Sequence, residues 1–156
     1  MPDAADAAAA RVGGRAPDVT LPDTHGTPVR LADLTAVLVV FVPFAFTAVC
    51  GGELRALRDA RGEFDGVGVR VVAISCDPPP TLRAWSEQER FGFDLLSDFW
   101  PHGAAARAFG VFDDGAGFAQ RGSFLLDAAG IVRWTVLSPP GQARSLDAYR
   151  AALAAL

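Results

Sequence analysis

The sequence predicts an α/β domain in which helices cover both faces of a central mixed β-sheet. Two continuous apolar runs, Val37–Val42 and Val69–Ile74, are typical of strands that are buried on both faces. Segments with helical spacing follow these runs, which alternates strands with helices along the chain. Near the end, Gly122–Leu126 and Ile131–Leu137 flank a turn, and this arrangement predicts an antiparallel strand pair.

The N-terminal part predicts a tail followed by a small hairpin. Residues 1–11 are rich in alanine and are expected to form a flexible tail, so the domain is placed at 12–156. Residues 16–23 are expected to hold a short strand bounded by prolines. His25-Gly26 is expected to form the turn that leads into a second short strand at Pro28–Leu31.

Four segments are predicted to be helical. The first begins after Pro43 and carries Leu54, Leu57 and Phe64 at helical spacing. For the second, Thr81 follows three prolines and is the expected N-cap. The remaining predicted bounds are Thr81–Phe91 for that second helix, Pro101–Phe109 for the third and Leu146–Leu156 for the last.

Composition and charge exclude several classes of function. Half of the 156 residues are apolar (51%), as in a compact soluble protein, and the longest apolar run, Ala36–Phe46, is too short to span a bilayer. The formal charge is −4 without a basic cluster, so neither nucleic acid nor a membrane is an expected partner. Met1–Ala10 lacks the features of a secretory signal, so a cytoplasmic location is expected.

Too few metal-binding side chains are present for a closed zinc site. The chain has two cysteines, Cys50 and Cys76, and two histidines, without a Cys-x-x-Cys pair. All of the basic residues are arginine, which excludes chemistry through a lysine Schiff base. We therefore expect no metal and no other cofactor.

The chemistry is predicted to lie where the first apolar strand ends. Pro43 ends the strand, and Thr47 precedes a helix whose first turn holds Cys50. If Thr47 is the N-cap, Cys50 takes the third helical position, where unpaired N–H groups and the helix dipole favour the reactive thiolate over the thiol. Pro43 fixes the local backbone and removes one N–H group, which helps to shield the sulfur from water.

Two charged residues complete the predicted site. Glu53, one turn past Cys50, would repel a thiolate unless a cation lay between them. Arg121 precedes a late strand that is expected beside the central one. A guanidinium held by Glu53 and aimed at Cys50 would favour the thiolate and stabilise charge that develops on an oxygen.

These residues carry a resemblance to a known family. Pro43-x-x-x-Thr47-x-x-Cys50 resembles the active-site signature of the peroxiredoxins, with Glu53 and Arg121 following. Other segments are similar to the one-cysteine alkyl hydroperoxide reductase E group of actinobacteria, and the resemblance covers roughly residues 12–156. These segments are Pro78–Thr81, Leu95–Ala104, Arg121–Phe124 and Ala151–Leu156.

The resemblance implies a thioredoxin-like fold and a hydroperoxide substrate. Cys50 would be the peroxidatic cysteine, with Pro43, Thr47 and Arg121 completing the catalytic site. Its thiolate would attack a peroxide and become a sulfenic acid, which an external thiol reduces. Mycothiol with a glutaredoxin-like mycoredoxin, or a thioredoxin-like protein, is the implied reductant, and a homodimer is the implied assembly.

The role of Cys76 stays open at this point. It follows the strand Val69–Ile74 and is expected at the same sheet edge as Cys50. It is either a resolving cysteine that traps the sulfenic acid as a disulfide, or a small packing residue. A disulfide requires Cα atoms within about 7 Å, which adjacent strand ends usually do not reach.

Other functions remain as alternatives. A thiol–disulfide exchanger is disfavoured because Glu53 stands where the second cysteine of a Cys-x-x-Cys pair would be. A Cys–His hydrolase lacks the Gly-x-Cys-x-Gly elbow, and a non-enzymatic redox-sensing module on the same fold is the third alternative. The apolar residues Phe44, Phe46, Phe99 and Trp100 suggest an apolar entrance that admits organic hydroperoxides besides hydrogen peroxide.

Overall fold

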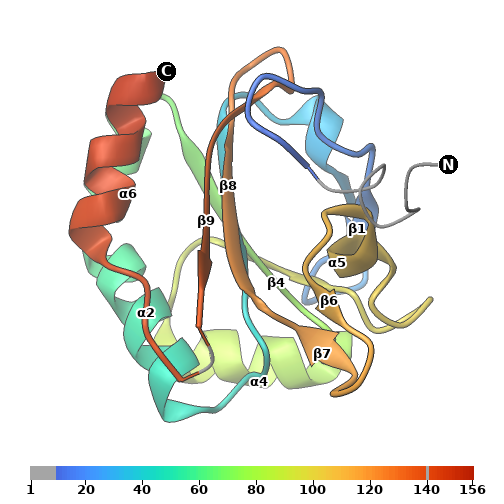
Figure 1. Cartoon of the computed structure of the whole chain (residues 1–156). Coiled ribbons are helices and arrows are strands. Elements are labelled where there is room, and N and C mark those ends of the chain that lie inside the picture. The colour runs from blue at the N-terminus through green and yellow to red at the C-terminus, as the bar shows by residue number, and fades with distance from the viewer. Residues whose placement is uncertain (1–9, 140) are drawn as a thin grey trace, which may run out of the picture.

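A five-stranded sheet organises the molecule in the computed structural model, which describes residues 10–139 and 141–156 (Figure 1). The strand order is β5-β4-β3-β8-β9, with β3, β4 and β5 parallel and β8 and β9 antiparallel to their neighbours. The strands are β3 (Val37–Phe41), β4 (Arg70–Ser75), β5 (Asp94–Ser97), β8 (Arg121–Leu126) and β9 (Val132–Ser138). This mixed sheet confirms the predicted α/β class.

Two small hairpins and several helices surround the sheet. The hairpins are β1 (Thr20–Pro22) with β2 (Pro28–Arg30), and β6 (Phe112–Asp113) with β7 (Phe118–Ala119). The α-helices are α2 (Ala48–Asp59), α3 (Arg61–Asp65), α4 (Pro79–Glu89), α5 (Ala104–Ala108) and α6 (Leu146–Ala152). Short 3-10 turns η1 (Leu31–Asp33) and η2 (Leu153–Ala155) follow β2 and α6.

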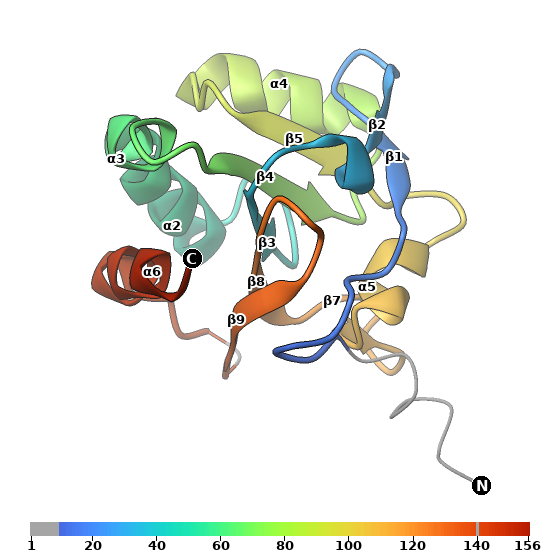
Figure 2. The same cartoon turned by 90° about the horizontal axis from the view of Figure 1, so that it is seen from above.

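Alternate residues of the central strands supply two cores, one on each face of the sheet. Leu38 and Val40 of β3 pack with the apolar sides of α2, α3, α4 and α6, whereas Val39 and Phe41 pack with α5 and the β1 segment. Figure 2 shows α2, α3 and α6 on one side of the sheet and α5 and β1 on the other. Burial on both faces explains why these strands read as continuous apolar runs.

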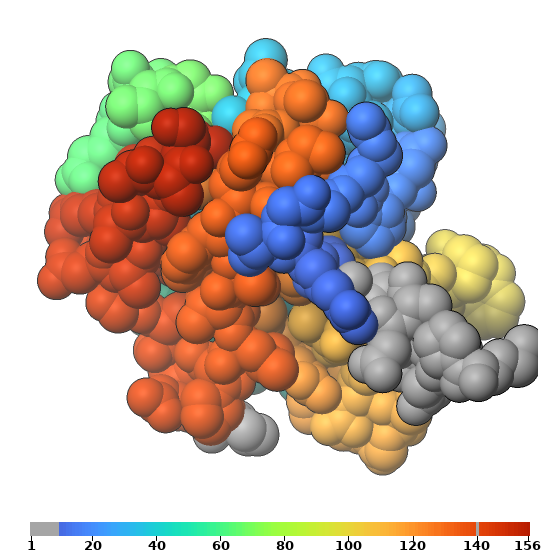
Figure 3. Space-filling view, turned by 45° about the horizontal axis from the view of Figure 1, so that its top comes forward, coloured from blue at the N-terminus to red at the C-terminus, as the bar shows by residue number. Residues whose placement is uncertain are grey.

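The N-terminal segment is fixed against the last hairpin of the sheet. Gly13 N–H donates to Val132 O at 2.8 Å, and Arg15 forms an isolated bridge with Ile131. In Figure 3 this segment, in blue, lies across the orange β8–β9 hairpin. Residues 1–9 of the predicted tail lie outside the described residues, whereas Ala10 already packs against the core beneath α5.

Several predicted boundaries need correction. The second predicted helix begins at Pro79, with Pro78 rather than Thr81 in the N-cap position, because proline is well tolerated in a first helical turn. The third helix is only Ala104–Ala108, since Gly103 at φ +71° marks its start, and the last becomes a 3-10 turn after Ala152. The first helix is divided at Ala60 into α2 and α3.

The sequence analysis missed the edge strand β5 and the β6–β7 hairpin. Asp94–Ser97 has only four residues, and its side chains give neither an alternating pattern nor a long apolar run. Its strand conformation depends on the register with β4, which pairs Ala73 with Leu95 and Ser75 with Ser97. Such pairing comes from tertiary structure and has no local signal.

Candidate active site

The central strand β3 leads directly into the helix that carries Cys50. Pro43 follows the end of the strand, and α2 begins at Ala48 with Thr47 in the N-cap position. Cys50 is therefore the third residue of α2, and its side chain is fully buried, with an exposure of 0%. The first turn of a helix presents N–H groups without intrahelical partners, and these favour an anion.

Thr47 occupies the N-cap position, but its side chain does not cap the helix. No side-chain capping bond is formed, and Thr47 Oγ1 instead donates to Phe44 O at 3.2 Å. The expected cap is therefore wrong in this detail, because the hydroxyl closes the preceding loop, residues 43–47. We call these residues the active-site loop.

Glu53 lies one turn beyond Cys50 and joins two buried arginines. Its carboxylate accepts a short hydrogen bond from Arg121 Nη1, as the sequence suggested. It also accepts from Arg144 through the backbone N–H at 2.7 Å, through Nε at 2.6 Å and through Nη2 at 3.2 Å. Two guanidinium groups thus face one carboxylate, so the buried cluster keeps one net positive charge at Glu53, one turn beyond Cys50 in α2.

The far side of this cluster is also hydrogen-bonded. Arg144 Nη1 donates to Gly122 O at 2.9 Å and to Ser123 Oγ at 3.0 Å, and the Ser123 hydroxyl pairs with Tyr149 OH at 2.8 Å. Arg121 differs, because its buried Nε has no hydrogen-bond partner among the residues that the structure describes. Arg144 is therefore a fixed structural member, whereas Arg121 retains a donor for another group.

Strand pairing explains why Arg121 reaches this position. It is the first residue of β8, which runs antiparallel to β3 with Val40 opposite Ser123. Continuing that register brings Arg121 to the end of β3, close to Pro43. Pro43 and Arg121 indeed line one cavity of about 550 Å³.

The cavity has an apolar wall that the sequence analysis did not identify. Besides Pro43 and Arg121 it is lined by Asp113, Phe118, Gln120, Leu137, Ser138, Pro139 and Gly141. The four aromatic residues that were expected at the entrance are not among its lining residues. Phe44 contributes only indirectly, since its ring packs on Phe118 with centroids 4.9 Å apart.

Cys76 lies at the same sheet edge as Cys50 but belongs to the other face. Cys76 follows β4, in which Val72 and Ile74 face the core beneath α5. Because every second residue of a strand points to the same face of the sheet, Cys76 lies on the face of Val72 and Ile74. Ala119, whose backbone lies close to the Cys76 sulfur, belongs to that same core, whereas Cys50 belongs to the opposite one. Burial, with Asp98 nearby, raises the pKa of the Cys76 thiol to about 11. A protonated thiol across the sheet is poorly placed to attack Cys50.

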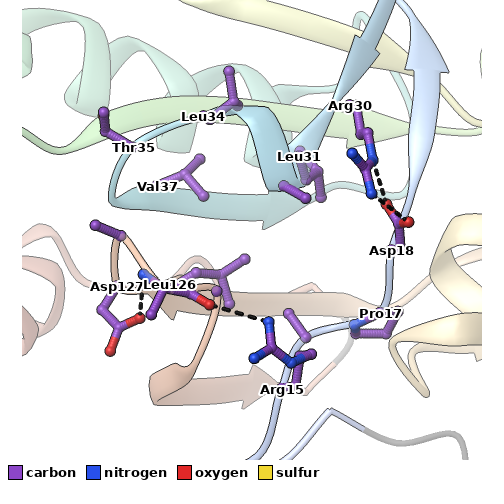
Figure 4. Close-up of a pocket in the computed structure, with 15 residues that line it drawn as sticks. Arg15, Pro17, Asp18, Arg30, Leu31, Leu34, Thr35, Val37, Leu126 and Asp127 are labelled. Atoms are coloured by element: carbon purple, nitrogen blue, oxygen red, sulfur yellow. Dashed lines mark hydrogen bonds and ion pairs between the residues drawn. The ribbon is translucent and has the colours of Figure 1, made fainter.

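A second hollow, of about 210 Å³, lies at the opposite end of β3 and holds none of the predicted site residues (Figure 4). Its arginines are engaged, because Arg30 pairs with Asp18 at 2.9 Å and Arg15 donates to Ala129 O at 3.3 Å.

Within residues 10–139 and 141–156, no group of three or more metal-binding side chains is positioned to hold an ion. No helix in that part of the chain is long and apolar enough to cross a membrane.

Two residues of the site escaped the sequence analysis. Arg144 lies in the loop between β9 and α6, and nothing in its neighbouring sequence distinguishes it from the exposed arginines. Asp77 accepts a hydrogen bond from Ala45 N–H at 2.8 Å and so contacts the active-site loop. Its place in Ser75-Cys76-Asp77-Pro78, directly after a buried strand, was the available signal.

Comparisons with known proteins identify the family and the fold. Residues 12–135 match the model of the AhpC/TSA family. Alkyl hydroperoxide reductase E of Mycobacterium tuberculosis is 47% identical over 148 residues, which cover 93% of this chain and 97% of that protein. The crystal structure of peroxidoxin BcpB from the same species has a TM-score of 0.83 at 33% identity and covers 94% of this chain and 96% of that one. Enterococcus faecalis AhpC, at 24% identity and a TM-score of 0.85 over 94% of this chain and 92% of that one, supports the fold. The chain belongs to the AhpC/TSA family and is a peroxiredoxin with the thioredoxin-like fold, an oxidoreductase of the thiol-dependent peroxidase class.

Proposed function

We propose that the protein reduces hydrogen peroxide and organic hydroperoxides through a sulfenic acid on Cys50. The observation that carries this proposal is the buried cluster that Glu53, one turn beyond Cys50 in α2, forms with Arg121 and Arg144. Its single net positive charge and the N-terminus of the helix both stabilise negative charge that develops on the reacting atoms. The unpartnered Nε of Arg121 supplies a donor for a peroxide oxygen.

The proposed reaction has two stages. The Cys50 thiolate donates an electron pair to the distal oxygen of the hydroperoxide, the O–O bond breaks, and the leaving alkoxide or hydroxide takes up a proton. Cys50 then carries a sulfenic acid. An external thiol attacks this sulfur, releases water and forms a mixed disulfide, which a second thiol reduces.

The oxidation product of one equivalent of peroxide tests this proposal. Intact mass spectrometry is expected to show one added oxygen on Cys50, both in the wild type and in Cys76→Ser. The physical reason is that Cys76 lies across the sheet with its pKa raised to about 11, so it does not resolve the sulfenic acid. A loss of two hydrogens in the wild type alone would show a Cys50–Cys76 disulfide and contradict one-cysteine chemistry.

The cavity at Pro43 and Arg121 supports a role for organic hydroperoxides as substrates. Phe118 forms part of its apolar wall, and truncating that ring removes contact area for an alkyl group. For Phe118→Ala we expect the second-order rate with cumene hydroperoxide to fall about threefold to tenfold further than the rate with hydrogen peroxide, each compared with the wild type. Stopped-flow oxidation of Cys50 measures both rates.

The matched control for that substitution is Phe99→Ala. Phe99 is an exposed aromatic residue that does not line the cavity, so its loss should leave both rates unchanged. Equal losses for the small and the bulky peroxide in Phe118→Ala would contradict a substrate-binding role for this wall.

We also propose that the protein forms a homodimer and that it is located in the cytoplasm. An external thiol system is proposed to reduce its oxidised Cys50. Exposed aromatic rings near the active-site end support the dimer, since monomers rarely expose such groups together. They are Phe44, Phe46, Phe99 and Trp100, with exposures of 45%, 49%, 47% and 79%.

Mycothiol with a mycoredoxin-like protein, or a thioredoxin-like protein, is the proposed reductant, because Cys76 lies on the other face of the sheet from Cys50 and is not placed to reduce it. Light scattering, cell fractionation and turnover with each reductant test these three points.

A further inference from the structure

Three contacts of the active-site loop with other elements bear on its position. Phe44 packs on Phe118 with ring centroids 4.9 Å apart, and Phe46 lies 6.1 Å from the Trp85 ring. Both of these loop rings remain nearly half exposed, so their contacts are partial. The third contact is a hydrogen bond, in which Ala45 N–H donates to Asp77 Oδ2 at 2.8 Å. Unlike a ring contact, a hydrogen bond fixes the direction of the loop backbone.

The backbone of the loop needs such a restraint. Phe46 has φ +63°, in the left-handed region that side chains other than glycine adopt at a cost on the order of 1–2 kcal/mol. A residue stays there only when its surroundings fix it. The hydrogen bond to Asp77 acts on the residue directly before Phe46, and the bond from Thr47 Oγ1 to Phe44 O closes the loop from within.

Asp77 is itself held by the ends of two strands. Ser75 Oγ donates to the same Oδ2 at 2.7 Å, and Asp77 N–H donates back to Ser75 Oγ at 3.2 Å. Ser97 Oγ donates to Asp77 O at 2.6 Å, and Ser75 and Ser97 are register partners of β4 and β5. The position of the carboxylate is therefore set by residues at the ends of β4 and β5.

We infer that Asp77 is a positioning residue of the peroxidase reaction, which sets the active-site loop relative to Cys50. The inference rests on the proposed function and adds to it a residue that contacts neither Cys50 nor the Glu53 cluster in the hydrogen bonds described above. Through Ala45 it fixes the loop that carries Pro43 and Thr47. An oxidation that requires aligned reacting atoms is sensitive to such placement, and an error of about 1 Å can cost on the order of a hundredfold in rate.

Comparing two reactions of the same sulfur tests this inference. In Asp77→Ala we expect the second-order oxidation of Cys50 by hydrogen peroxide to fall at least about tenfold. Alkylation by iodoacetamide at the same pH should stay within about twofold, since this reagent makes no use of the aligned site. In Asp77→Asn most of the oxidation rate should return, because the amide oxygen still accepts from Ala45 N–H.

Two serine variants serve as matched companions. Ser97→Ala removes a bond to the Asp77 backbone and leaves the carboxylate bonded to Ala45, so it should lower the ratio of oxidation to alkylation by the smallest factor of the three variants. Ser75→Ala loosens the carboxylate and should lower this ratio by a smaller factor than Asp77→Ala. If Asp77→Ala does not fold, the ratio in Ser75→Ala decides the question.

Other outcomes overturn the inference. A wild-type oxidation rate in folded Asp77→Ala, or equal losses of oxidation and alkylation, would mean that Asp77 does not position the loop for the reaction. A failure of Asp77→Asn to recover would assign the effect to charge instead of to the hydrogen bond. If wild-type Cys50 itself does not react with peroxide, the proposed function fails, and that result is distinct from each of these.

Discussion

Replacing Cys50 with serine is expected to lower peroxide consumption by at least about a thousandfold, because the hydroxyl is a far weaker nucleophile than a thiolate at neutral pH. The surrounding groups remain in place, so the fold should be kept. Cys50 is the third residue of α2 and is buried, and serine is nearly the same size. The measurement is peroxide turnover with a thiol reductant in excess, together with a thermal melt.

Cys76→Ser is the matched control for that experiment. Its sulfur is buried on the other face of the sheet, with a pKa raised to about 11, so turnover should stay close to that of the wild type. Residual activity in Cys50→Ser at the level of the wild type would remove the basis of the proposed function. A large loss in Cys76→Ser with a normal melt would restore the resolving role that the sequence left open.

Removing the Glu53 carboxylate is expected to have the largest effect on stability. In Glu53→Ala the buried guanidinium groups of Arg121 and Arg144 lose their common counter-ion. Breaking a buried ion pair from one side costs about 3–5 kcal/mol, because a charge is left without compensation. The free energy of unfolding from a urea titration measures this loss, and peroxidase activity should fall with it since Arg121 is no longer held.

Two further variants make the Glu53 result specific. Glu53→Gln keeps an acceptor oxygen and should lose less stability than alanine. Glu63→Ala removes an exposed carboxylate that pairs with Arg150 at 2.8 Å, and such surface pairs contribute little. Equal stability of Glu53→Ala and Glu63→Ala would contradict the view that Glu53 neutralises a buried cluster.

The strands of the sheet core and the position of Cys50 in the fold could be predicted from the sequence. Val37–Val42 and Val69–Ile74 are continuous apolar runs, and only burial on both faces explains such runs in a chain with 21% charged residues. The strand-to-helix transition at Pro43 and the first-turn position of Cys50 follow from local signals, since proline, threonine and helical spacing act within a few residues. The pairing of Glu53 with Arg121 was inferred from charge alone and is present in the structure.

The rest of the candidate site depends on long-range contacts that no local pattern predicts. Arg144 lies 91 residues from Glu53 in the sequence, and no local pattern marks it as the second cation of the buried cluster. Asp77 directly follows a buried strand, but its contact with Ala45 arises only because β3 and β4 are parallel neighbours. The face on which Cys76 lies depends on strand alternation and on what packs there. Long-range pairing sets these contacts, and a sequence encodes them only through the whole fold.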